Sequence, residues 1–296
     1  MIIGGDRAAV IENIRAAAES GDFYKKVELN DPILSKAEEA EITDGFLSSR
    51  NGMQYRFKSF LARRIADTAM KAVNKNTEII GAEKVEGFKG KGAVITSNHF
   101  SPFENTVIRK LVKEYAGGRL DIVSQSENFK MQGIIGFLMN YADTVPLSGD
   151  HRYMQKGFID VLGSMLKKGD KILIYPEQEM WFNYRKPRPG KRGAYYYAAK
   201  LSAPVISCFV EIKDLESLDT EDFYNVKYIL HILGVLYPDE KKSVRENSIE
   251  MCERDNELKK EAYERIYGKK LDYGFEKSDI AGLVRYPLKA AVKNEL

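Results

Sequence analysis

Short apolar runs alternate with helical patterns between Gly92 and about Leu236, and this alternation limits the possible folds more than any other feature of the chain. The runs have the length of buried strands, and the stretches between them have the 3.6-residue periodicity of helices. Strands joined by helices in this way form crossover units, so we expect an α/β fold with a largely parallel sheet flanked by helices. The expected strands are 93–96, 120–124, 144–147, 171–175, 204–210 and 227–233, and the expected helices are 103–116, 131–141, 153–168 and 191–201.

The two ends of the chain have other patterns. Residues 1–75 contain helical stretches and polar connectors but no strand pattern. Beyond residue 238 the chain is strongly charged, with Val244, Met251 and Leu258 spaced seven apart on one helical face. Too few heptads follow for a coiled coil, which favours a helix packed on the outside of the core. We therefore divide the chain into an N-terminal helical segment (1–75), a catalytic domain (76–237) and a C-terminal helical extension (238–296).

Composition excludes some classes of function. The formal net charge of +3, from 46 basic and 43 acidic residues, is too small to indicate a nucleic-acid partner. Cys208 and Cys252 lack metal-ligand spacing and are typical of reduced cytosolic thiols. No apolar run approaches the ~20 residues that are needed to cross a bilayer. Charged residues interrupt the N-terminus, where a secretory signal would need an uninterrupted apolar segment. We expect a cytoplasmic protein whose contact with a membrane is peripheral.

One of the three histidines follows a predicted strand directly, in the sequence TSNHFSPFEN. Ser101 is expected to cap the next helix and Pro102 to occupy its first position, which brings Glu104 close to His99. A carboxylate that orients an imidazole makes it a general base, as an alcohol needs when it attacks an acyl thioester. The alternative is structural, because Ser101 and Glu104 also have the spacing of a capping box.

Four segments, in this order, resemble motifs of the glycerolipid acyltransferases, the family that includes 1-acylglycerol-3-phosphate and other lysophospholipid acyltransferases. SNHFSPFEN (97–105) resembles the first motif, a histidine followed after four residues by an acid. IYPE (174–177) is similar to the Phe-Pro-Glu motif. KRGA (191–194) and APVI (203–206) are similar to the basic-Gly-Ala helix and the Pro-containing final strand. The resemblance covers roughly residues 75–210.

The resemblance implies an O-acyltransferase of phospholipid biosynthesis at the inner membrane surface. It implies transfer of a fatty acyl group from acyl-CoA or acyl-carrier protein to a hydroxyl of a lysophospholipid or related lipid precursor, with no bound cofactor, no metal and no covalent intermediate. By carry-over, His99 is the general base, Glu104 the acid that orients it, and Glu177 a residue of the acceptor site.

The chain departs from the family pattern at two motifs. Glu104 replaces the usual Asp, and Gln178, Glu179 and Met180 stand where Gly-Thr-Arg is usual, so the acceptor phosphate loses an expected cation. A basic loop just beyond could replace it, because arginine and lysine bind phosphate oxygens well. The alternative is a solvated loop without a ligand. The candidate substrate-binding residues in this loop are Arg185, Arg188, Lys191 and Arg192.

The family pattern also has a middle motif, and the chain has two further histidines. Residues 144–152 match its middle motif loosely, which makes Arg152 another substrate-binding candidate. His151 is expected at the surface, and His231, in an apolar strand, is expected to have a satisfied core role.

Residues 53–73 form a candidate membrane-contact helix. Its large apolar side chains fall near one helical face and basic side chains lie elsewhere on the turn, a pattern typical of a helix in an anionic membrane interface. The alternative is a helix that covers the core with its cations in water. The apolar residues are Phe57, Phe60, Leu61, Ile65 and Val73, and the basic residues are Arg56, Lys58, Arg63, Arg64 and Lys71.

Two functions of other classes remain open at this point. In a metal-dependent hydrolase, His99, Glu104 and Glu177 would hold a metal ion that activates water. One histidine with carboxylates is a poor ligand set for zinc. In a noncatalytic lipid-binding protein, the chain would keep the fold, but the altered motif at 178–180 would no longer support acyl transfer.

Overall fold

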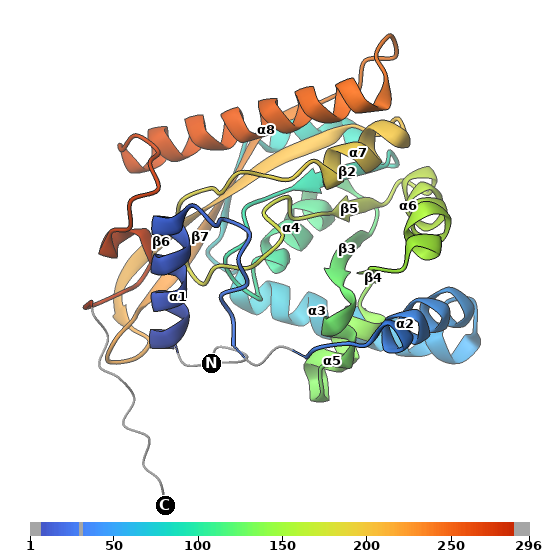
Figure 1. The fold of residues 1–296 in the computed structure, drawn as a ribbon, viewed down its shortest axis with the longest axis horizontal. Coiled ribbons are helices and arrows are strands. Elements are labelled where there is room, and N and C mark those ends of the chain that lie inside the picture. Colours follow the sequence, from blue (N-terminus) through green and yellow to red (C-terminus); the bar gives the residue numbers. More distant parts are fainter. Residues whose placement is uncertain (1–6, 30–31, 287–296) are drawn as a thin grey trace, which may run out of the picture.

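The computed structural model of the protein describes residues 7–29 and 32–286, with a seven-stranded sheet at its centre (Figure 1). In chain order the strands are β1 (Glu78–Ile80), β2 (Ala93–Thr96), β3 (Leu120–Gln125), β4 (Thr144–Leu147), β5 (Lys171–Leu173), β6 (Val205–Leu218) and β7 (Tyr224–Leu236). They lie side by side in the order β1-β7-β6-β2-β5-β3-β4. The strands from β6 to β4 in this order run parallel, whereas β7 is antiparallel to β6. The expected largely parallel α/β sheet is confirmed.

Helices cover both faces of the sheet. The helices are α1 (Arg7–Ser20), α2 (Lys36–Ser49), α3 (Met53–Val73), α4 (Asn105–Leu111), α5 (Gly133–Tyr141), α6 (Phe158–Lys167), α7 (Gly193–Lys200) and α8 (Val244–Tyr267), with shorter turns at η1 (Ala82–Phe88), η2 (Val112–Ala116), η3 (Ser126–Lys130), η4 (Tyr153–Gly157) and η5 (Lys277–Asp279). The side chains of η1, α4 and η2 pack on one face, and those of α6, α7 and α8 pack on the other. Among the described residues, no helix is long and apolar enough to cross a membrane.

Strand β2 shows why the central runs are continuously apolar. Successive side chains of a strand point to opposite faces, so Val94 packs with α7 and α8 while Ile95 packs with α4. All four residues of β2 are buried, as expected for an internal parallel strand with helices on both sides. The burial fixes the strand firmly, and the chain that leaves its carboxyl end carries His99.

The last two predicted strands are longer than expected and form one hairpin. β6 and β7 pair antiparallel along most of their length, with a register shift between Ser207 and Cys208. The short strand β1 pairs with the free edge of β7. The sequence pattern predicted neither the antiparallel direction of β7 nor the strand β1. An apolar run indicates that a strand is buried, but not its direction or its neighbour in the sheet.

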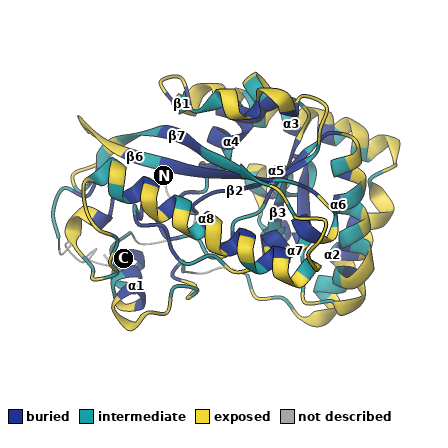
Figure 2. Cartoon of the chain, turned by 90° about the horizontal axis from the view of Figure 1, so that it is seen from above, coloured by how far each residue is buried: buried dark blue, intermediate teal, exposed yellow. Residues whose placement is uncertain are grey.

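The helices before residue 75 lie in two separate places (Figures 1 and 2). Helices α2 and α3 contact η3, β4, α4 and α5. Helix α1 instead packs against the loop after β5 and against the C-terminal segment. We call this group the satellite cluster, whose buried members are Val10, Ile11, Ile14, Ala17, Ala18, Val27, Trp181, Phe182, Tyr184, Phe223, Ile280 and Leu283.

Helix α8 packs on the outside of the core, as its apolar stripe predicted, and Met251 and Ala262 are buried there. It also carries a buried ion pair, in which Lys259 Nζ lies 2.7 Å from an oxygen of Asp255. The same carboxylate accepts hydrogen bonds from Thr96 Oγ1 at 2.7 Å and from the hydroxyls of Ser207 and Tyr195. Burial would raise the pKa of Asp255, but Lys259 and these hydroxyls hold it below its ordinary value. This network ties α8 to β2 three residues before His99.

Candidate active site

The turn after β2 is fixed by Asn98, a residue to which the sequence analysis gave no role. Its side-chain amide donates to the Val210 carbonyl at 3.0 Å, and its side-chain oxygen accepts from the Val210 N–H at 2.8 Å. The side chain of Asn98 therefore extends the hydrogen bonding between the β2 and β6 segments beyond the end of β2. The next residue, His99, leaves the sheet at its carboxyl edge, where ligands of open α/β sheets bind.

Glu104 orients His99 and the surrounding backbone at the same time. Its Oε1 lies 2.5 Å from Nδ1 of His99, and its Oε2 accepts from the N–H groups of Phe100, at 3.0 Å, and of Ser101. Glu104 is buried, while the side chain of His99 keeps 20% of its surface exposed. An ionised Glu104 requires a proton on Nδ1, which leaves Nε2 as the basic nitrogen. Nε2 has no hydrogen-bond partner among the described residues.

The expected start of the following helix is wrong by a few residues. Helix α4 begins at Asn105, and the Ser101 hydroxyl accepts from the N–H of Phe103 at 3.2 Å rather than from that of Glu104. The side chain of Glu104 folds back onto the N–H of Ser101, as in half of a capping box. One carboxylate oxygen of Glu104 therefore makes the backbone contact of the structural interpretation, and the other makes the contact with His99 on which the catalytic interpretation depends.

Tyr175 forms the second support of His99. The two rings are stacked, with centroids 4.0 Å apart and an angle of 8° between their planes. Burial and the neighbouring charge of Glu104 raise the pKa of Tyr175 well above its ordinary value, so the phenol stays protonated. The sequence analysis quoted Tyr175 within the second motif but gave it no role. The only signal was its position two residues beyond the end of β5, the neighbour of β2.

Glu177 and Arg188 form a buried clamp on the backbone of His99. Oε2 of Glu177 accepts from the N–H of His99 at 3.1 Å and from Arg188 Nη2 at 3.0 Å, and Oε1 accepts from the N–H of Arg188 at 3.0 Å. Arg188 also donates to the carbonyls of Phe23, at 2.9 Å, and of His99, at 3.3 Å, and lies over the Trp181 ring. Both charged side chains are buried. The sequence analysis predicted that Glu177 and Arg188 contact the acceptor. This prediction is corrected, because both side chains are buried and hydrogen-bonded to other groups of the protein.

A cavity of about 390 Å³ opens beside His99. Near the carboxyl ends of β3 and β5 its wall is polar and includes Gln125, Glu127, Gln178 and Glu179. Between the sheet, α3, α4 and α5 the wall is mainly apolar, with Ala66, Ala69, Ile122, Ile135, Leu138 and Met139. The site thus combines a polar mouth, an oriented imidazole and an apolar interior.

One buried cation, Arg109 of α4, lines the apolar part of this cavity. Its Nη2 lies 3.4 Å from the carbonyl of Ala142, and its Nε has no hydrogen-bond partner among the described residues. Burial lowers the pKa of Arg109 below its ordinary value, although the charges of Asp143, Asp67 and Asp121 oppose that shift. Nothing in the sequence pattern distinguished Arg109 from the surface cations of a helix.

The other basic candidates are dispersed. Lys191 lines the cavity, with its Nζ 4.2 Å from the centroid of the Tyr24 ring, and Arg192 is exposed beside it. Arg185 donates to the Ile212 carbonyl at 3.2 Å and pairs with Asp214 at 2.5 Å, away from the cavity wall. The four basic candidates of the loop are therefore not brought together at one site, and of them Lys191 lines the cavity. The solvated-loop alternative is wrong for Arg188, which is buried.

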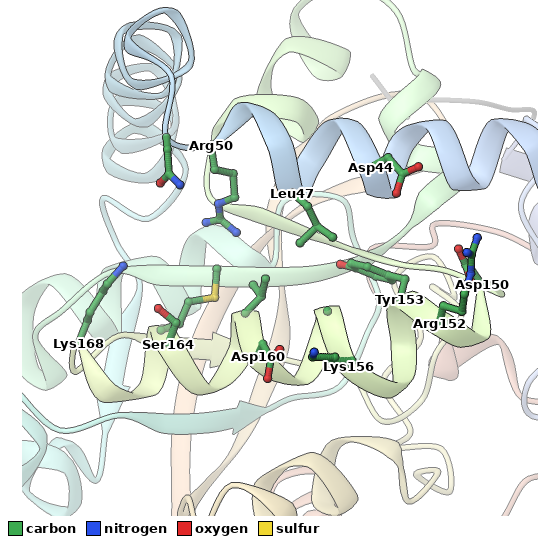
Figure 3. A pocket seen from close by; sticks show the side chains of 14 residues that line it. Asp44, Leu47, Arg50, Asp150, Arg152, Tyr153, Lys156, Asp160, Ser164 and Lys168 are labelled. Atoms are coloured by element: carbon green, nitrogen blue, oxygen red, sulfur yellow. The ribbon is translucent and has the colours of Figure 1, made fainter.

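Arg152 lines a second cavity, of about 730 Å³, between α2 and the η4–α6 segment (Figure 3). It is exposed there beside Asp150 and does not line the cavity of His99, so the predicted contact with the same acceptor is corrected. His151 is exposed, as expected. His231 is nearly buried, with Nε2 2.8 Å from Glu211, which confirms its satisfied core role.

The ligand set of the hydrolase alternative does not converge. The oxygens of Glu104 face Nδ1 of His99 and two backbone N–H groups, and those of Glu177 face Arg188 and the backbone of His99. Within residues 7–29 and 32–286, no group of three His, Cys, Asp or Glu side chains is placed to hold a metal ion.

Part of the chain is similar to known proteins. Residues 76–211 match the family model described as Acyltransferase. No curated protein matches the chain. Among solved structures, the 1-acyl-sn-glycerophosphate acyltransferase PlsC from Thermotoga maritima is similar at 18% sequence identity with a TM-score of 0.49, over 80% of this chain and 96% of that chain.

Proposed function

Through residues 76–211 the chain belongs to the acyltransferase family, and from this premise we propose that it transfers a fatty acyl group from a thioester donor to the hydroxyl of a lysophospholipid or related lipid precursor. The donor would be acyl-CoA or acyl-carrier protein. The observation that carries this proposal is the His99–Glu104 pair, whose free Nε2 lies at a cavity with a polar mouth and an apolar interior.

The geometry supports a direct transfer. Nε2 of His99 accepts the proton of the acceptor hydroxyl as its oxygen bonds to the thioester carbonyl carbon. Glu104 stabilises the imidazolium that forms, since its Oε1 is already hydrogen-bonded to Nδ1. The tetrahedral intermediate then collapses, the carbon–sulfur bond breaks, and the imidazolium returns its proton to the departing thiolate. The acyl chain would occupy the apolar part of the cavity.

The surface of α3 supports contact with a membrane. Phe57 is 63% and Phe60 49% exposed, whereas Ser59, Ala62 and Met70 of the same helix are buried. Helix α3 also covers part of the protein, because Met70 is buried and the helix contacts α4 and α5. Arg56 and Arg64 lie on the same helix, and each basic residue near an anionic surface contributes about 1 kcal/mol to binding. We propose that α3 lies in the membrane interface from which the acceptor is taken.

A radiolabelled acyl donor incubated with a panel of lysolipids tests the proposed function. We expect His99→Ala to lose at least about a hundredfold in rate, because it removes the base. His151→Ala, a change at an exposed histidine outside the cavity, is the matched control and should retain full activity. Equal product from His99→Ala and the unaltered protein would reject the proposal, and binding of lysolipid without any product would favour the noncatalytic alternative.

A further inference from the structure

Two carboxylates without an ion pair line the mouth of the His99 cavity. Glu127 makes no hydrogen bond or ion pair with any residue that the structure describes, although it is partly buried. Glu179 is also partly buried. Its carboxylate accepts a hydrogen bond of 2.8 Å from Nε2 of Gln125 and forms no ion pair within the described part of the chain, although its charge acts on that of Arg188. Neither carboxylate is therefore neutralised by a direct ion pair.

The fold brings these two groups to the same place. Gln125 is the last residue of β3, and Glu127 follows it in η3. Glu179 lies in the loop after β5, the parallel neighbour of β3, and its hydrogen bond to Gln125 joins the two loops. Both carboxylates therefore stand at the carboxyl edge of the sheet, from which Nε2 of His99 is reached.

The loop that carries Glu179 contributes several side chains to the cavity. Gln178, Glu179 and Met180 all line it, and none of the three is a cation. Three cations among the described residues line the same cavity. They are Lys26, the buried Arg109, and Lys191, which is exposed and next to the Tyr24 ring. The mouth thus offers negative charge on one part of its wall and positive charge on another.

We propose that the acceptor is a lysophospholipid whose headgroup carries a cationic amine in addition to its phosphate. This inference rests on the acyltransferase function proposed above. Glu127 and Glu179 bind the ammonium group, and Lys191 binds the phosphodiester. A phosphate monoester, which is more negative and has no ammonium group, meets two like charges at the same wall and is disfavoured, because like-charge contacts suppress a wrong partner.

Acceptor competition tests this assignment on the full chain. Lysophosphatidylethanolamine, lysophosphatidylglycerol and 1-acylglycerol-3-phosphate with one common acyl chain are compared by kcat/KM with one acyl donor. We expect lysophosphatidylethanolamine to be favoured by at least about tenfold over both. Glu127→Gln and Glu179→Gln should each raise KM for this acceptor and leave KM for lysophosphatidylglycerol nearly unchanged. Glu179→Arg should shift the preference toward the phosphate monoester.

The control is Glu86→Gln, which removes an exposed carboxylate of η1 outside the cavity and should leave all three values unchanged. Thermal unfolding of each variant shows whether it is folded. An unaltered protein that prefers the phosphate monoester, or an acceptor ratio that does not change in the Glu127 and Glu179 variants, overturns the headgroup assignment. If transfer then still depends on His99, the acyltransferase proposal stands by itself, whereas no transfer to any acceptor overturns both.

Discussion

The imidazole of His99 and the phenol ring of Tyr175 lie face to face, 4.0 Å apart and nearly parallel. Glu104 holds His99 at one atom, Nδ1, and a single hydrogen bond leaves the ring free to rotate about it. The stacked ring removes that freedom, and the electron-rich face of an aromatic ring also favours the imidazolium that forms during transfer. Tyr175 is therefore a positioning residue for the base.

Replacing Tyr175 separates this positioning from general packing. We expect Tyr175→Leu to lower kcat about tenfold or more with little change in KM, since a small displacement of a catalytic group costs rate rather than binding. Tyr175→Phe keeps the stacked ring and should retain most of the activity. Steady-state kinetics of the two variants decide the matter, and an equal loss in both would argue against stacking as the cause.

Changing Glu104 tests its double role. Glu104→Gln keeps the length of the side chain but removes its charge, so we expect kcat to fall by about a hundredfold or more. Glu104→Asp keeps the charge, but its shorter side chain cannot reach Nδ1 of His99 and the N–H groups of Phe100 and Ser101 together. An intermediate rate is expected for Glu104→Asp. The measurement is kcat of the unaltered protein, of Glu104→Asp and of Glu104→Gln, which should decrease in this order. A Glu104→Gln variant as active as the unaltered protein would contradict the assignment.

The buried clamp between Glu177 and Arg188 should appear in stability. Removing one partner leaves an unpaired buried charge, which typically costs about 3–5 kcal/mol of unfolding free energy. We expect Glu177→Gln and Arg188→Met each to show such a loss in denaturant unfolding. The double variant should lose less than the sum of the two, because it leaves no charge unpaired. Additive losses would show that the two side chains act independently.

Asp121 in β3 should make stability depend on pH. Burial, reinforced by the charge of Asp143, raises the pKa of Asp121 to about 8. The folded state therefore holds a proton that the unfolded state has already released, so stability decreases as pH rises from about 4 toward 8. Asp121→Asn removes this group, and we expect the Tm of the variant relative to that of the unaltered protein to be higher at pH 9 than at pH 6. A Tm difference independent of pH would contradict the expectation.

The exposed face of α3 predicts vesicle binding. Phe57→Ser with Phe60→Ser removes two large apolar side chains, each of which contributes roughly 1.5–3 kcal/mol when fully buried in an apolar medium. We expect the affinity for anionic vesicles to fall by at least about tenfold in a sedimentation assay. The matched control is Leu215→Ser with Leu218→Ser, two exposed apolar residues of the β6–β7 hairpin. Equal vesicle affinity of the two double variants would exclude α3 as the contact.

The sequence was sufficient where the determinants lie close together in the chain. The central strands were predicted because their residues are buried on both faces, and His99 and Glu104 were predicted because five positions separate them. The rest depends on contacts between distant segments. The hydrogen bonds of Asn98 to Val210 and of Arg188 to the carbonyl of Phe23 depend on which segments the fold brings together. The sequence therefore left open whether the basic loop is solvated, although Arg188 within it is buried.

The satellite cluster has a consequence for how the two chain ends affect catalysis. Arg188, which holds the backbone of His99, donates to the carbonyl of Phe23, and the indole N–H of Trp181 donates to the carbonyl of Lys25. From the other end of the described chain, Tyr286 donates to Glu12 of α1. Proteolytic removal of residues before 26 should therefore inactivate the enzyme without cutting any residue that matches the acyltransferase family. Loosening of α1 or of the segment at Tyr286 would reach His99 through these backbone contacts, so parts of the protein far from the cavity help to hold the proposed base in place.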